Sequence, residues 1–160
     1  MTTKPILNRS DITLNSREIA QRLPHAGKMC LLHEVIEASS DALTAEANSH
    51  LDADNPLRLD GKIATVNGIE YAAQAMAIHG SLLLSELSST ASETPQTGYI
   101  ATVRNIQMAV PFIPETGAAL VINVQQLMSD SNGFTYQFHI DCEQQRLISG
   151  KITVFLTGRE

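Results

Sequence analysis

The chain has 160 residues and a mass of 17.4 kDa, which fits one domain and leaves little room for a second. Apolar residues make up 43% and charged residues 18%, a balance that supports a buried core and excludes intrinsic disorder. The formal net charge of -6 argues against a general nucleic-acid-binding protein, because such a protein needs a cationic face.

The cysteine count and the hydropathy pattern indicate a compartment. Two cysteines, Cys30 and Cys142, are too few for a disulfide framework and predict buried thiols in a reducing compartment. No apolar run reaches the roughly 18 residues of a membrane span, and the N-terminus lacks the apolar stretch of a signal peptide. We therefore expect one cytoplasmic domain over residues 1–160, with residues 1–22 as an N-terminal extension.

The first part of the chain predicts a short helix, two strands and an irregular loop. In chain order these elements are expected over Ser16–Leu23, Lys28–Glu37, Ala42–Ala47 and His50–Val66. Asn15 or Ser16 provides a polar cap for the helix, and Pro24 ends it. The loop is assigned from its Asp, Asn, Pro and Gly content.

One long helix is predicted, over Gly68–Leu87. Its apolar residues follow helical spacing and also fill most of the remaining surface, which is typical of a buried helix. Gly80 weakens the middle of this helix. The following segment, Ser88–Gly98, is rich in Ser, Thr, Glu and Pro and is expected to be an exposed linker.

The rest of the chain predicts four strands. They are expected over Tyr99–Ala109, Ala119–Met128, Phe134–Cys142 and Leu147–Leu156. The third has the clearest alternation of apolar and polar residues, and the preceding Asp130–Gly133 is a hairpin turn signal. Six strands with one buried helix between the second and third predict an α+β domain, in which an antiparallel sheet wraps around a central helix.

Glu70 is the first candidate for chemistry. It lies in the first turn of an otherwise apolar helix, and Gln74 follows one turn later on the same face. Apolar surroundings favour the protonated form of a carboxyl group, which suits a general acid near neutral pH. The alternative is structural, because Asn67 and Glu70 also have the spacing of a capping box. The spacing leaves both readings open.

Histidines supply the candidate bases. His25 lies in a turn made rigid by the preceding proline, and His50 opens the irregular loop and has the reach to approach the helix start. His79 is nine residues from Glu70, half a turn out of phase, so it is expected to serve packing. His139 belongs to the polar face of its strand and is expected to be solvated.

Other kinds of site lack their motifs. No His or Cys pair has metal-ligand spacing, and the acidic loop lacks the spacing of an EF-hand, so no metal site is predicted. A phosphate-binding glycine loop and a Gly-x-Ser-x-Gly motif are also missing.

Three segments together resemble a known family. They are Leu23-Pro24-His25 followed by Leu31-Leu32 and Val35, the helix segment Gly68–Ala77 with its Glu and Ala-Gln, and the strand–turn–hairpin order after Tyr99 with the Pro111–Gly117 turn. Their order and spacing resemble the hot-dog-fold β-hydroxyacyl-[acyl carrier protein] dehydratases of fatty acid synthesis. The resemblance covers most of residues 20–157 and is closest to the branch that acts in aryl polyene synthesis.

The resemblance implies a fold, a substrate and an assembly. It implies a hot-dog domain that pairs its sheet with a second subunit, as a homodimer or heterodimer, with active sites at the interface. The substrate would be an acyl chain on the phosphopantetheine of an acyl carrier protein, and no cofactor would be required. An acidic carrier protein would bind basic residues near the loop, for which the candidates are Arg58, Lys62 and Arg104.

The resemblance also assigns site residues. The family's acidic residue corresponds to Glu70, while substrate contacts are expected from Gln74, Gly68 and Ile69. Backbone N–H groups at the helix start, around Asn67–Ile69, would polarise the thioester carbonyl. The family's usual histidine corresponds to Pro56.

The missing histidine leaves three possibilities open: His50 reaches the site through a longer loop, His25 has taken the role, or dehydration is lost. We favour His25, since its segment matches the family. Two other functions stay open, namely an acyl thioesterase in which Glu70 activates water and a non-catalytic subunit that pairs with an active dehydratase.

Overall fold

The computed structural model describes residues 12–87 and 98–157. Its helices and strands are, in chain order, α1 (Ser16–Arg22), β1 (Glu34–Ala38), β2 (Ala42–Ala47), α2 (Gly68–Leu87), β3 (Gly98–Met108), β4 (Leu120–Ser129), β5 (Gly133–Cys142) and β6 (Gln145–Leu156). Short 3-10 turns lie at Gly27–Met29, Ser49–Leu51 and Thr65–Asn67. Most of the predicted linker, residues 88–97, lies outside the described residues.

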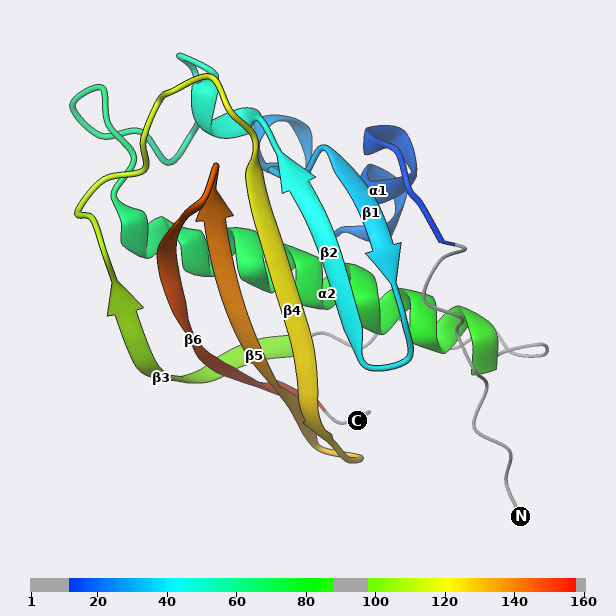
Figure 1. Cartoon of the computed structure of the whole chain (residues 1–160). Coiled ribbons are helices and arrows are strands. Elements are labelled where there is room, and N and C mark those ends of the chain that lie inside the picture. Colours follow the sequence, from blue (N-terminus) through cyan, green and yellow to red (C-terminus); the bar gives the residue numbers. More distant parts are fainter. Residues whose placement is uncertain (1–11, 88–97, 158–160) are drawn as a thin grey trace.

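The strands form one antiparallel sheet in the order β1-β2-β4-β5-β6-β3. Helix α2 lies across one face of this curved sheet and packs on β2, β4 and β5, while β3 forms the edge opposite β1 (Figure 1). The predicted α+β domain, with six strands and a helix between the second and third, is confirmed. Within the described ranges, no helix has both the length and the apolar character required to span a membrane.

Alternation along β5 shows how the sequence builds the core. Tyr136, Phe138 and Ile140 are buried against α2, whereas the residues between them face the outer side of the sheet. Period-two burial of this kind fixes which side of the strand meets the helix. Asp130 closes the β4–β5 hairpin as predicted, because its carboxylate accepts the N–H of Gly133 at 3.1 Å.

Two sequence predictions need correction here. The strand expected over Lys28–Glu37 is shorter, because residues 27–29 form a 3-10 turn and β1 begins only at Glu34. Gly27 has a φ of 59°, a left-handed conformation that breaks a strand. Both cysteines are free thiols, but only Cys142 is buried and Cys30 is partly exposed.

His79 belongs to a buried polar network, as its position out of phase with Glu70 predicts. Its Nε2–H donates to the carbonyl of Ser39 at 2.9 Å, so Nδ1 accepts the hydroxyl of Tyr136 at 2.6 Å. The Gln126 amide donates to the same hydroxyl at 3.1 Å. The network joins α2 to the β1–β2 turn and to the β4–β5 pair, and it requires a neutral imidazole.

Two buried histidines, His79 in this network and His50 in the turn Ser49–Leu51, predict that the protein loses stability in mild acid. Burial lowers the pKa of His79 and of His50 below the ordinary value of 6.5. The unfolded chain therefore binds more protons below pH 6.5, and the free energy of unfolding falls by up to about 1.4 kcal/mol per pH unit for each histidine until the folded pKa is reached. The dependence fades over about one pH unit above 6.5, as the histidines of the unfolded chain lose their remaining protons.

Urea unfolding at a series of pH values from about 7.5 to 5.5 measures this loss. The substitution His33→Gln is the control, since His33 is exposed, and it should leave the pH dependence unchanged. The substitution His79→Leu should flatten the curve while lowering the stability at neutral pH. A wild-type curve without slope below pH 6.5 would contradict the prediction.

Candidate active site

Glu70 and His25 meet at the first turn of α2. The Nε2 atom of His25, in the segment between α1 and β1, lies 3.0 Å from Oε1 of Glu70, and each side chain is 30% exposed. An acid and a base are thus in direct contact, half-buried but open to solvent.

The structure separates the two candidate histidines. His50 is buried in the 3-10 turn Ser49–Leu51, and no described hydrogen bond or ion pair joins it to Glu70. Of the two, only His25 contacts the carboxylate.

Gln74 ties this pair to the segment that carries the histidine. Its Nε2 donates to the carbonyl of Met29 at 2.7 Å and to Oε1 of Glu70 at 3.2 Å, and its Oε1 accepts the N–H of Leu31 at 2.9 Å. The side chain is almost completely buried. Both of its N–H groups are used within the chain, so the structure gives Gln74 a positioning role in place of the expected substrate contact.

Further contacts hold the same segment. The hydroxyl of Ser49 donates to the carbonyl of Leu31 at 2.8 Å, and the thiol of Cys30 donates to the carbonyl of His25 at 3.3 Å. Lys28 and Asp54 form an exposed ion pair at 3.3 Å. The histidine is therefore carried by a loop that is fixed on several sides.

A buried polar network lies in the loop before α2, where the family that the sequence resembles has its histidine. Asn55, beside the corresponding Pro56, is buried and donates to the carbonyl of Ser49 at 2.8 Å and to the hydroxyl of Tyr71 at 3.3 Å. The hydroxyl of Tyr71 also lies 2.9 Å from Oγ of Ser49. These residues connect the irregular loop to α2 and have no acid–base pair among them.

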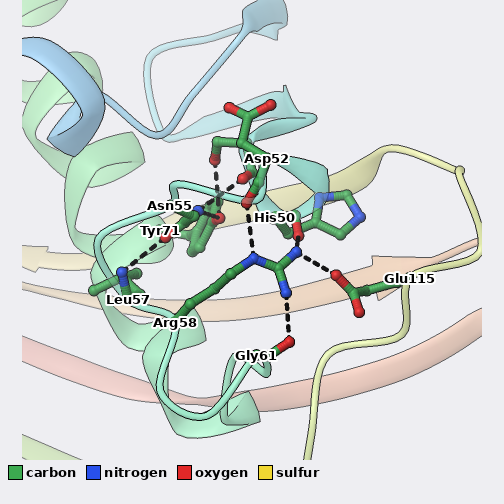
Figure 2. Close-up of polar contacts among 9 residues, drawn as sticks. His50, Asp52, Asn55, Leu57, Arg58, Gly61, Tyr71 and Glu115 are labelled. Carbon is green, nitrogen blue, oxygen red and sulfur yellow. Dashed lines mark hydrogen bonds and ion pairs between the residues drawn. The ribbon is translucent and has the colours of Figure 1, made fainter.

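Arg58 holds the irregular loop from within (Figure 2). Its guanidinium donates to the carbonyls of His50, Asp52 and Gly61 at 2.7–2.8 Å and pairs with Glu115. The side chain is only 12% exposed. Arg58 is thus engaged inside the protein, which makes it unsuited to the carrier-protein contact expected from the sequence.

The other two basic candidates remain on the surface. Lys62 is exposed, with its ammonium 4.8 Å from the ring centre of Phe112. Arg104 is exposed on β3.

Arg58→Ala is expected to lower the free energy of unfolding by about 2–4 kcal/mol, because three loop carbonyls and the carboxylate of Glu115 lose a charged donor. Urea unfolding measures the change. Arg146→Ala is the matched control, since it breaks the exposed pair with Asp141 and should cost less than about 1 kcal/mol. Equal losses in the two variants would contradict the role assigned to Arg58.

The start of α2 corrects two more predictions. The capping-box alternative for Glu70 is wrong: Asn67 ends a 3-10 turn that runs into the helix, and the carboxylate of Glu70 contacts His25 and Gln74. The N–H groups of Asn67 and Gly68 already donate to carbonyls of that turn, so they are not free to polarise a thioester.

Gly68 and Ile69 also serve packing. A Cβ at Gly68 would lie 2.9 Å from Cγ2 of Ile148, so glycine permits the close approach of helix and sheet. Ile69 is partly buried against the core.

Solved structures with the same fold place the chain among known proteins. It is similar to a chain of the dehydratase heterocomplex ApeI:P from Xenorhabdus doucetiae, with a TM-score of 0.74 and 23% identity over 88% of this chain and 91% of that chain. It also resembles the thioesterase HI1161 from Haemophilus influenzae, with a TM-score of 0.62 and 14% identity over 91% of this chain and 92% of that chain. These similarities confirm the hot-dog fold.

Sequence comparison adds the family. No curated protein matches the chain significantly. The profile of the ApeP-like family, described as ApeP dehydratase, matches residues 17–158, which include the His25 segment, the irregular loop and the whole of α2. The chain therefore belongs to the ApeP-like family of dehydratases.

Proposed function

We propose that this chain dehydrates β-hydroxyacyl thioesters carried by an acyl carrier protein, in the synthesis of fatty acids or polyene-type products. The observation that carries the proposal is the 3.0 Å contact between His25 and Glu70 at the start of the central helix. Family membership supports the reaction class. The resemblance to aryl polyene dehydratases supports the pathway, and the cytoplasm is the proposed location.

The reaction needs one base and one acid. Neutral His25 removes the proton from the α-carbon, the electron pair forms the double bond, and the C–O bond at the β-carbon breaks. Protonated Glu70 donates its proton to the departing hydroxyl, which leaves as water. His25 then holds one proton more and Glu70 one proton fewer than before. Their direct contact lets that proton pass from Nε2 to Oε1, which restores the starting state.

Substrate delivery and assembly are part of the same proposal. The acyl chain arrives on phosphopantetheine, and the chemistry requires no further cofactor and no metal. Exposed Lys62 is the proposed contact for an acidic carrier protein. The chain pairs with another hot-dog subunit, in a homodimer or a heterodimer, and the similarity to a heterocomplex supports this pairing.

A second candidate is a non-catalytic subunit of a dehydratase heterodimer. It is favoured by one observation, the buried Asn55 network in the loop where the resembling family has its histidine. In that case the contact between His25 and Glu70 would be structural.

Mass spectrometry of β-hydroxyacyl and enoyl carrier proteins, incubated with the purified chain, distinguishes the functions. Loss of water from the hydroxyacyl form, and its reversal from the enoyl form, is expected. Release of free acid would instead indicate a thioesterase. No conversion by the chain alone, but conversion when a second hot-dog subunit is added, would require testing His25→Ala in the complex. Full activity of that complex would show that this chain is the non-catalytic subunit.

A further inference from the structure

The edge strand β3 has the features of an association surface. It pairs with β6 on one side only, so its outer edge has no strand partner in the described part of the chain. On the side that faces the helix, Ile100, Val103 and Met108 are 45%, 36% and 51% exposed. Helix α2 packs on β2, β4 and β5 and leaves these side chains uncovered. An unpaired edge with an apolar inner face favours addition of a strand from another chain.

The outer face of the same edge carries two uncompensated cations. Arg104 on β3 lies directly opposite Lys151 on β6, and both side chains are exposed. Like charges at directly opposite positions destabilise a sheet. Neither side chain forms an ion pair with any described residue. Gln137 and Gln125 continue the same row across β5 and β4, so the row has no carboxylate.

Neighbouring rows do not supply a counter-charge either. The outward side chains on one side are threonines, with Thr102 opposite Thr153, and on the other side Gln107 lies opposite Ser149. The nearest outward carboxylate on β5 is Asp141, four residues from the position opposite Lys151 and thus roughly 13 Å along the strand. Asp141 is already paired with Arg146 at 2.9 Å. The two cations therefore remain available to a partner.

Pairing of β3 with β3 of a second copy would add to the electrostatic repulsion between cations and would supply no carboxylate, whichever residues lie opposite one another. A twofold interface brings the same strand against itself, and residues 98–108 contain no Asp or Glu. Whichever residues face one another, Arg104 of one copy meets only neutral or basic side chains of the other. Lys151 follows in the same row of each copy. A partner strand with carboxylates on its outer face would instead neutralise the pair.

We propose that Arg104 and Lys151 select the subunit that pairs with β3, favouring a hot-dog subunit with an acidic edge strand over a second copy of this chain. This inference rests on the proposed association with another hot-dog subunit and specifies the charge of that subunit's edge. The repulsion disfavours the homodimer, and the attraction favours the heterodimer, so one pair of residues supplies both parts of the discrimination.

A charge-reversed version of the chain provides the acidic edge for the test. The wild type is mixed at equal concentration with isotope-labelled Arg104→Glu/Lys151→Glu, and native mass spectrometry measures the composition of the dimers. We expect the mixed dimer to exceed the like dimers by about tenfold at low salt, and the excess to shrink at high salt as screening increases. Arg17→Glu/Arg146→Glu is the matched control, because it makes the same charge change at exposed positions outside β3 and should give a statistical mixture.

A statistical mixture for the β3 variant, an equal excess for the control, or the absence of dimers in every mixture would overturn the proposal. The readout is the composition of dimers and not dehydration. Loss of the proposed catalytic activity would therefore leave the result of this experiment unaffected, and the two proposals can fail separately.

Discussion

His25→Ala is expected to reduce the turnover of β-hydroxyacyl carrier protein by about 10²- to 10⁴-fold, the usual contribution of a positioned general base. The imidazole touches Glu70 at 3.0 Å, so its removal takes away the group that accepts the α-proton. The side chain is partly exposed and the loop is held by other residues, so the fold should persist. Steady-state formation of the enoyl product, at a temperature where both proteins are folded, measures the effect.

Glu70→Gln should cause a loss of similar size, because an amide fills the same space but has no acidic proton to give. The two losses should not add in the double variant, since the acid and the base act as a unit. The single substitution Glu70→Gln also tests the pair without changing the side-chain volume at the start of α2.

Two other histidines are the controls for His25. His33→Ala changes an exposed side chain and should leave turnover unchanged. His50→Ala removes a buried ring and should lower stability, but turnover per folded molecule should persist. Loss of activity in His50→Ala alone, at matched stability, would show that the wrong histidine has been assigned. Unchanged activity in both His25→Ala and Glu70→Gln would favour a non-catalytic subunit.

The local sequence pattern predicted the bounds of those helices and strands that pack in the same way along their whole length. The bounds of α2 agree with the sequence prediction, because an apolar helix inside a curved sheet has the same contacts along its whole length. Strand β2 agrees as well. The segment before β1 was predicted as a strand because Met29 and Leu31 are apolar. Its backbone instead bonds to Gln74, some 45 residues later, and no local pattern encodes that contact.

For the site residues too, local patterns predicted the residues that act within one turn or helix face, but not contacts made by folding back of the chain. Proline before His25 and the spacing of Glu70 and Gln74 indicated a rigid turn and a shared helix face, and the structure brings these three residues together. Arg58 was predicted as a surface charge from its loop, but three carbonyls of that loop and Glu115 surround it. A long charged side chain in a loop gives no sequence signal for such folding back.

Gln74→Met is expected to lower both stability and turnover, because one amide holds the loop and the carboxylate together. Methionine has a similar size, so the change removes hydrogen bonds and leaves little cavity. The N–H of Leu31 and the carbonyl of Met29 lose their partner in a buried place, which should cost about 2–4 kcal/mol of unfolding free energy. The ring of His25 would then sample positions away from Glu70, and a displacement of about 1 Å can cost 10²-fold in rate.

Gln126→Met separates positioning from stability, because Gln126 also donates a hydrogen bond to a buried partner, Tyr136, at a distance from the site. It should lower stability and leave kcat unchanged in the folded protein. For Gln74→Met we expect kcat to fall by at least tenfold with a smaller change in KM, and the NMR signals of the His25 ring to shift. Equal kcat values for the two variants, measured well below their unfolding temperatures, would reduce Gln74 to a structural residue and leave the placement of His25 to Ser49 and Cys30.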